Sequence, residues 1–169
     1  EPAGARLAAG VGVHLGVEHD HPDRHAQLHS GQAISPMLRH RRPHCLDEWL
    51  EARPEVTKVH YAGLASSPWH ARSAEYLPNG NGAIVAFELA GGLEAGRSFI
   101  NNLSLVSHLA NVGDVRTLAI HPASTTHQQL TPEEQAASNV TPGLVRLSVG
   151  IESSNDIIAD LEAALSAKA

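Results

Sequence analysis

A strand is predicted near the C-terminal end of the chain by alternating apolar positions. In residues 143–152, "GLVRLSVGIE", every second side chain is apolar: Val145, Leu147, Val149 and Ile151. Successive side chains of a strand point to opposite faces of a sheet, so these four share one face, which we expect to belong to the core.

The opposite face of this strand carries one charge, Arg146, among Leu144, Ser148 and Gly150. A guanidinium presents a planar fork of donors that fits a carboxylate or a phosphate, which indicates an anion site. The alternative is that Arg146 lies on a half-exposed face and pairs with a neighbouring acid. This alternative needs no ligand, because most surface charges are merely solvated. From the residues alone, both interpretations stay open.

Helix signals recur from residue 45 onward. Residues 45–56, "CLDEWLEARPEV", predict a short helix that ends ahead of Pro54. Ser67 as N-cap and Pro68 at the first helical position predict a second helix, and residues 92–103 a third. Thr131 and Glu134 form a capping box around a proline start. A last helix follows Ser153, with an apolar stripe that we expect to be buried: Ile157, Ile158, Leu161 and Leu165.

Four further segments have the composition and length of strands: residues 56–61, 83–89, 104–109 and 116–120. The order of elements is therefore helix, strand, helix, strand, helix, strand, strand, helix, strand, helix. This order predicts an α+β fold, a mixed or mostly antiparallel sheet with helices on one face. The other face is left for another role, and Arg146 belongs to it.

Composition excludes several classes of protein. The 169 residues suffice for one domain, and the net charge of -6 with a pI near 6.0 argues against nucleic acid or an anionic membrane surface as a partner. A single cysteine, Cys45, excludes an internal disulfide framework and fits a reducing compartment. No apolar run reaches membrane-spanning length and no signal-peptide pattern is present, so we expect a cytoplasmic protein.

Residues 1–44 differ from residues 45–169, which read as one globular domain. The first segment is rich in His, Arg and Pro, holds seven of the twelve histidines and lacks Phe, Trp and Tyr, so we expect it to be mobile. His21, His25 and His29 are spaced four apart, with Asp20 and Asp23 nearby. Imidazole clusters bind zinc, copper or nickel, but Pro22 interrupts the helix that would align them, so we expect weak, adventitious binding and assign no metal site.

Three long motifs resemble a known family. They are "YAGLASSPWHARSAEYLPNGNGAIVAFELAGG", "SLVSHLANVGDVRTLAIHPASTTHQQLTPEEQ" and "GLVRLSVGIE". Together they resemble the C-terminal domain of the fold-type I pyridoxal phosphate (PLP) enzymes of cysteine and methionine metabolism. Within "HLANVGDVRTLAIHPASTTH" the chain is most similar to the O-acetylhomoserine sulfhydrylases, which make homocysteine or methionine from O-acetylhomoserine and sulfide or methanethiol.

The resemblance implies roles for particular residues. The residue matching Arg146 holds the α-carboxylate of an amino acid substrate, and the one matching Ser107 lies beside the cofactor and the same carboxylate. Four others would shape the cleft: Asn111, Asp114, His121 and Thr125. For these four the alternative is loop structure held by hydrogen bonds from side chain to backbone.

The resemblance also implies that part of the family's site is missing. In the family a large N-terminal domain and a partner subunit supply the Schiff-base lysine and the groups that hold the cofactor. Neither lysine here, Lys58 or Lys168, lies in the family's Ser-x-Thr-Lys context. We therefore expect the 169 residues alone not to bind PLP and to be inactive, with a separate N-terminal domain or a second copy as partner. Uncovered apolar area around Leu103, Leu105 and Val106 predicts self-association.

The front of the chain departs from the family. "GQAISP", residues 31–36, resembles the segment before the family's joining helix, but "MLRHRRPHC" stands where an aromatic-rich helix is expected. We hypothesise that residues 1–44 include translation of a shifted reading frame. Three functions stay open: part of a sulfhydrylase, an inactive binding or oligomerising module, and a His-rich metal-handling protein that rests on residues 1–44 alone.

Overall fold

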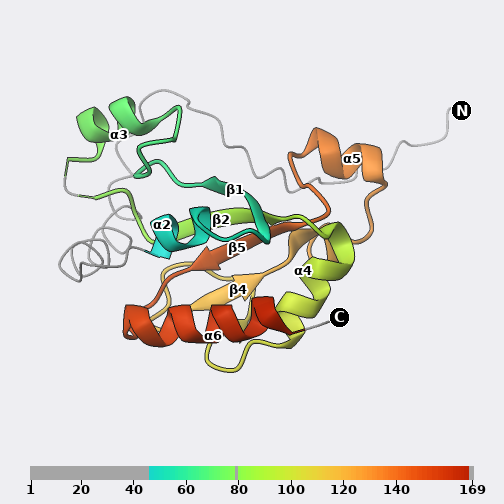
Figure 1. Cartoon of the computed structure of the whole chain (residues 1–169). Coiled ribbons are helices and arrows are strands. Elements are labelled where there is room, and N and C mark those ends of the chain that lie inside the picture. The colour runs from blue at the N-terminus through green and yellow to red at the C-terminus, as the bar shows by residue number, and fades with distance from the viewer. Residues whose placement is uncertain (1–45, 79, 168–169) are drawn as a thin grey trace, which may run out of the picture.

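A five-stranded sheet forms the centre of the molecule (Figure 1). The computed structural model describes residues 46–78 and 80–167. The strand order is β1-β2-β5-β4-β3, and every neighbouring pair is antiparallel except β3 and β4. The predicted α+β fold with a mostly antiparallel sheet is therefore confirmed. The strands are β1 (Val56–His60), β2 (Ile84–Leu89), β3 (Ser107–His108), β4 (Leu118–Ile120) and β5 (Leu144–Ser148).

Three helices form a layer on one face of the sheet. They are α2 (Leu46–Glu51), α4 (Gly92–Asn101) and α6 (Ser154–Ser166). Two others, α3 (His70–Tyr76) and α5 (Pro132–Ala137), lie away from this layer at opposite ends of the molecule (Figure 1). A 3-10 turn, η2 (Pro122–Ser124), follows β4. The opposite face of the sheet is thus free of the three packed helices.

The core lies between the sheet and this helical layer. Phe87 on β2 and Phe99 on α4 meet edge to face with ring centroids 5.6 Å apart, and burying each such side chain contributes about 1.5–3 kcal/mol. The predicted core face of β5 and stripe of α6 are confirmed at most positions. The following are buried: Val145, Leu147, Val149, Ile157 and Leu161. Ile158 and Leu165 pack against them.

Ile151 does not belong to the core. Its side chain is 56% exposed, because β5 ends at Ser148 and the alternation of faces ends with it. The expectation that Ile151 shares the core face was therefore wrong.

A bulge in β1 separates the two faces of this edge strand. Val56 pairs with Leu89 and Lys58 with Glu88, so one extra residue lies in β1 between these pairs. The bulge lets Val56 and Val59 both pack on the core, while Lys58 joins the face opposite the helical layer. The Thr57 hydroxyl donates a hydrogen bond to the Glu88 carbonyl (3.1 Å).

Several elements are shorter than the sequence predicts. Helix α3 begins at His70 rather than beside Ser67, because the Ser67 backbone carbonyl accepts the His70 N–H in a turn that precedes the helix (3.1 Å). The predicted strand over residues 104–109 contracts to β3, because the Asp160 carboxylate accepts the N–H groups of Ser104 (2.8 Å) and Val106 (2.9 Å). The capping box of α5 is confirmed, with the Thr131 hydroxyl accepting the Glu134 N–H.

The expected apolar patch is also composed differently. Val106 is only 4% exposed and Leu103 packs against the core, whereas Leu105 is exposed. The exposed apolar side chains nearby belong to the next loop and the end of β5: Leu109, Val112, Val115 and Ile151.

Some expectations lie outside the described residues, among them the His21, His25 and His29 cluster, the reading-frame hypothesis and Lys168. In the described ranges, no helix has the length and apolar character needed to cross a membrane. The same ranges hold no group of three His, Cys, Asp or Glu side chains placed to bind a metal ion.

Candidate functional site

Arg146 and Ser107 lie on the same face of the sheet. Arg146 on β5 is the register partner of Ile120 on β4. Two positions along the strands, Ser148 is the partner of Leu118, which in turn is the partner of Ser107 on β3. Register partners point to the same face. The two residues expected to meet the substrate carboxylate are therefore brought to one surface, opposite the helical layer.

The Arg146 guanidinium is only partly satisfied. Its Nη2 donates a long hydrogen bond to the Asn111 carbonyl (3.4 Å), and its Nε is buried without a hydrogen-bond partner among the described residues. Glu88, an acid on the same face, pairs instead with His60 (2.7 Å). Within the described ranges Arg146 makes no salt bridge with an acid. Because a buried donor without a partner is costly, this side chain is poised for an acceptor such as a carboxylate.

The loop over residues 109–116 runs beside Arg146. The Gly113 N–H donates to the Ser148 hydroxyl (3.3 Å), which ties the loop to β5. The Asn111 side chain accepts the N–H of Val112 (2.9 Å), and the Asp114 carboxylate accepts the N–H of Arg116 (3.0 Å). Both side chains thus build the loop, as the alternative interpretation expects. Asn111 contacts Arg146 through its carbonyl.

His121 lies on the other side of the sheet. It is fully buried, and its Nε2 donates to the Pro142 carbonyl (2.7 Å) while its Nδ1 accepts from the Ser124 hydroxyl (2.7 Å). Burial lowers the pKa of His121. A Cβ added to Gly96 of α4 would lie 2.2 Å from Nε2, so the imidazole packs directly on that helix.

Thr125 is also engaged in this turn, since its hydroxyl donates to the His121 carbonyl (2.8 Å). His121 and Thr125 therefore hold the chain after β4 rather than facing Arg146. A cleft-shaping role remains a prediction that would act only through the loop they anchor.

Glu152 and Asp160 organise this region, although neither is among the site residues predicted from the sequence. Asp160 holds the chain before Ser107, and Glu152 accepts hydrogen bonds from the backbone and the hydroxyl of Thr117 (2.7 and 2.8 Å). The one signal in the sequence is that Glu152 closes the "GLVRLSVGIE" motif. Nothing in a local pattern points to Asp160, because its partners are remote in sequence.

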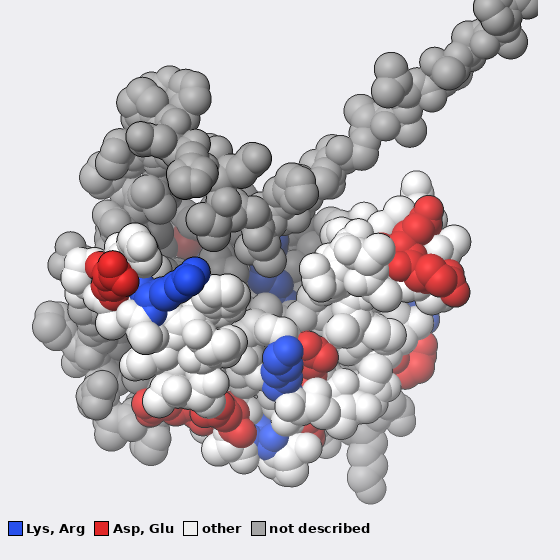
Figure 2. Space-filling model, turned by 90° about the horizontal axis from the view of Figure 1, so that it is seen from above, with Lys and Arg blue, Asp and Glu red and all other residues white. Residues whose placement is uncertain are grey.

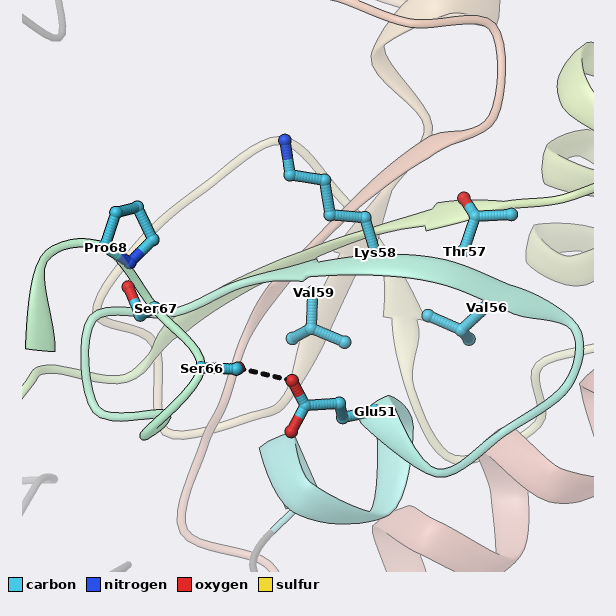
Figure 3. A pocket seen from close by; sticks show the side chains of 8 residues that line it. All are labelled: Glu51, Val56, Thr57, Lys58, Val59, Ser66, Ser67 and Pro68. Atoms are coloured by element: carbon cyan, nitrogen blue, oxygen red, sulfur yellow. Dashed lines mark hydrogen bonds between the residues drawn. The ribbon is translucent and has the colours of Figure 1, made fainter.

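A hollow of about 240 Å³ lies apart from Arg146, beneath β1 (Figure 3). Glu51 of α2 accepts a hydrogen bond from the Ser66 hydroxyl there. Lys58 extends from the other side of β1, away from Glu51 (Figure 3). The lining residues are Glu51, Val56, Thr57, Lys58, Val59, Ser66, Ser67 and Pro68.

The described residues do not fit a complete PLP site. Lys58 is the one lysine in the described ranges, and it is exposed on an edge strand rather than enclosed. A Schiff-base lysine needs an enclosed site with an acid for the ring nitrogen and donors for the phosphate. Seen from above, the visible described surface carries only small, separate groups of positive and negative side chains (Figure 2). What the described residues offer is the Arg146 guanidinium, with a buried Nε–H that has no partner among them.

Residues 38–166 match the family of Cys/Met metabolism PLP-dependent enzymes, and the chain belongs to this family. The resemblance described above is confirmed, and PLP is the cofactor of the family. The chain is 55% identical over 120 residues to O-acetyl-L-homoserine sulfhydrylase 1 of Thermus thermophilus, covering 71% of this chain and 28% of the relative. It is 47% identical over 124 residues to an L-methionine gamma-lyase of Pseudomonas putida, covering 73% of this chain and 31% of the relative.

Solved structures agree with this assignment. The fold is similar to that of an O-acetylhomoserine (thiol)-lyase of Campylobacter jejuni that carries N'-pyridoxyl-lysine-5'-monophosphate, with a TM-score of 0.70 and 34% identity over 80% of this chain and 32% of that one. It is also similar to a cystathionine gamma synthase of Xanthomonas oryzae pv. oryzae, with a TM-score of 0.65 and 37% identity over 82% of this chain and 33% of that one. The chain spans less than a third of the length of the curated relatives described above.

Proposed function

We propose that this chain supplies the substrate-carboxylate side of the site of an O-acetylhomoserine sulfhydrylase-like enzyme. The reaction converts O-acetylhomoserine and sulfide, or methanethiol, to homocysteine or methionine with release of acetate. Arg146 binds the α-carboxylate of the amino acid, and Ser107 lies beside it. The location that fits this metabolism is the cytoplasm.

The observation that carries the proposal is the state of Arg146. Its Nε–H is buried and unpaired among the described residues, and its Nη2 donates only a long hydrogen bond to the Asn111 carbonyl there. Glu88, an acid on the same face, already pairs with His60. A carboxylate that meets the guanidinium fork would satisfy this donor and add a charge-assisted hydrogen bond. A fixed carboxylate in turn orients the rest of the substrate for reaction.

A second reaction has support from one relative. The 47% identity to an L-methionine gamma-lyase is close to the identity shared with the sulfhydrylases. Both names denote an amino acid substrate, so the same role for Arg146 serves either reaction. The choice between them depends on residues around the substrate side chain.

The 169-residue chain alone is expected to be inactive, since Lys58 is exposed and the described residues do not fit the cofactor. In an active enzyme, the residues that hold the cofactor would then come from outside these 169 residues. The remaining candidate is a catalytically inactive module that only binds or oligomerises.

The proposal is tested most fully in a chimera. Residues 46–169 replace the matched C-terminal residues of the Thermus thermophilus sulfhydrylase, and homocysteine formation from O-acetyl-L-homoserine and sulfide is measured. We expect turnover, and a loss of about 100-fold in kcat/KM with Arg146→Ala, because hydrogen bonds to charged groups are worth about 1.5–3 kcal/mol each. Lys58→Arg is the control and should leave kcat/KM unchanged. An Arg146→Ala chimera with full kcat/KM would contradict the proposal.

Two further measurements separate the alternatives, one on the chimera and one on the 169-residue chain alone. Release of methanethiol from L-methionine by the chimera, in place of homocysteine formation, would favour the gamma-lyase reaction. The 169-residue chain alone is treated with PLP and borohydride, followed by peptide mapping. We expect no saturable labelling, and specific labelling of one lysine would show that the chain holds the cofactor by itself.

A further inference from the structure

Glu152 joins the end of β5 to the start of β4. Its Oε1 accepts a hydrogen bond from the Thr117 N–H (2.7 Å), and its Oε2 accepts one from the Thr117 hydroxyl (2.8 Å). Oγ1 of Thr117 in turn accepts the N–H of Gly150 (2.9 Å). Thr117 is fully buried, so this connected set of hydrogen bonds includes an ionised acceptor in a region of low dielectric, where such bonds are strong.

Thr117 transmits this constraint to Ser107. The Thr117 carbonyl accepts the Ser107 N–H (3.0 Å), which begins the parallel pairing of β3 with β4. Strand β3 has only two residues, and just beyond it the Leu109 N–H donates to the Ala119 carbonyl (3.2 Å). Thr117 is therefore one of the residues of β4 and its start that fix the position of Ser107 relative to the sheet.

Close packing leaves little freedom for this junction to move. A Cβ at Gly150 would lie 2.4 Å from the Val115 carbonyl oxygen and 2.5 Å from Glu152 Oε2. The Ile151 N–H also donates to the Val115 carbonyl (2.9 Å). The backbone on both sides of Glu152 thus fits closely against the chain that enters β4.

On the other side of Ser107, Asp160 of α6 accepts the N–H groups of Ser104 and Val106. Asp160 fixes the chain that leads into β3, whereas Glu152 acts through the ladder partner of Ser107. Two carboxylates from different elements therefore hold Ser107 from two directions.

We infer that Glu152 is a positioning residue: through Thr117 it holds Ser107 at the place where it meets the substrate carboxylate bound by Arg146. Glu152 touches neither the substrate nor Arg146 in this arrangement. The inference rests on the proposed function, because the role of Ser107 is part of that proposal. In this proposal Arg146 and Ser107 contact the carboxylate, whereas Glu152 acts only by placing Ser107.

The 169-residue chain is titrated with O-acetyl-L-homoserine by NMR, and the exchange rate of the Ser107 amide proton is measured in the same samples. Glu152→Ala should weaken binding about fivefold and speed Ser107 exchange about tenfold, since each lost hydrogen bond is worth about 1 kcal/mol. Glu152→Gln should restore both, because its amide oxygen can accept the Thr117 N–H while its NH2 donates to the hydroxyl. Glu94→Ala, an exposed carboxylate paired with Arg97, is the control and should change neither.

A second pair of variants guards against a failure of Glu152→Ala to fold. Thr117→Val removes only the hydroxyl and keeps the N–H, so it should change binding and exchange in the same direction, and Thr117→Ser should restore both. If the Ala and Val variants lose unfolding free energy but keep wild-type affinity and Ser107 exchange, Glu152 is merely structural and the inference is overturned.

The outcomes also separate this inference from the proposed function. Binding that survives Arg146→Ala, or no binding to the wild-type chain, contradicts the proposed function, and the role of Ser107 at a carboxylate is lost with it. Binding that requires Arg146 but is unaffected by Glu152→Ala and Thr117→Val overturns the positioning role alone.

Discussion

Arg146 and Ser107 reach one face of the sheet from strands that are not neighbours. Strand β4 lies between them, and it is antiparallel to β5 but parallel to β3. Ile120 is the partner of Arg146, and Leu118 is the partner of Ser107. Because a slip of one residue turns every side chain to the other face, the register of β4 decides whether both residues meet the same ligand.

Arg146→Lys should weaken binding of O-acetyl-L-homoserine about tenfold, because a lysine ammonium lacks the planar fork of donors. The free energy of unfolding should change by less than about 1 kcal/mol, since the wild-type guanidinium makes only a long hydrogen bond to Asn111 within residues 46–78 and 80–167. Affinity is measured by calorimetric titration and stability by urea unfolding. Equal affinity of Arg146→Lys and wild type would show that the fork is not used.

Gly96→Ala should lower the free energy of unfolding by about 2 kcal/mol, as overpacking of a close contact typically does. The added Cβ would lie 2.2 Å from His121 Nε2, so the imidazole would have to leave the Pro142 carbonyl. In a His121→Ala background the same substitution should cost less, because the side chain that it meets is gone. Urea unfolding of the four proteins of this cycle measures the difference. An equal cost in both backgrounds would mean that the contact is not the cause.

Stability should fall as the pH drops below 6.5 because of His121. Burial lowers its folded pKa below the ordinary value of 6.5, so the unfolded chain takes up the proton first and unfolding becomes easier. The loss accumulates between 6.5 and the lowered folded pKa and then stops. Urea unfolding at about pH 7.5 and about pH 5.5 should show a smaller change for His121→Gln than for wild type. The exposed His70→Gln is the control, and a wild-type-like pH dependence in His121→Gln would contradict this assignment.

The wild-type chain should self-associate through the apolar side chains beside β3 and at the end of β5. Leu109, Val112 and Val115 are 51%, 57% and 63% exposed, and contiguous apolar area favours association. The double variant Leu109→Ser, Val112→Ser should have a smaller average mass by light scattering. Tyr76→Ser, at an exposed position on α3, serves as the control and should retain the wild-type mass. A monodisperse wild-type monomer would be the contrary result.

Much of the fold follows from local sequence signals. The alternation of β5, the stripe of α6 and the capping box at Thr131 depend on residues close together in the chain, and the structure bears them out except at Ile151. Arg146 could be singled out for the same reason, because one charge on an otherwise regular strand is visible in the pattern itself. Its relation to Ser107 required the order and register of the strands.

The errors arise where remote groups take over backbone hydrogen bonds. Asp160 of α6 occupies the N–H groups that the predicted strand over residues 104–109 would have used, and β3 is short as a result. Ser67 accepts bonds in a turn rather than capping α3. His121 has the type of a binding residue, but its environment, Gly96 and Pro142, comes from segments far away in sequence. No local pattern contains that information.

The most direct test concerns the buried Nε–H of Arg146. Its resonance in a 15N-correlated NMR spectrum is assigned by its absence from Arg146→Lys and followed during titration with O-acetyl-L-homoserine and, separately, with its methyl ester. Carboxylate binding by Arg146 predicts a saturable shift with the acid and little or none with the ester, which lacks the charge. Equal shifts with both ligands, or none with the acid, would contradict the role of Arg146 and with it the proposed function.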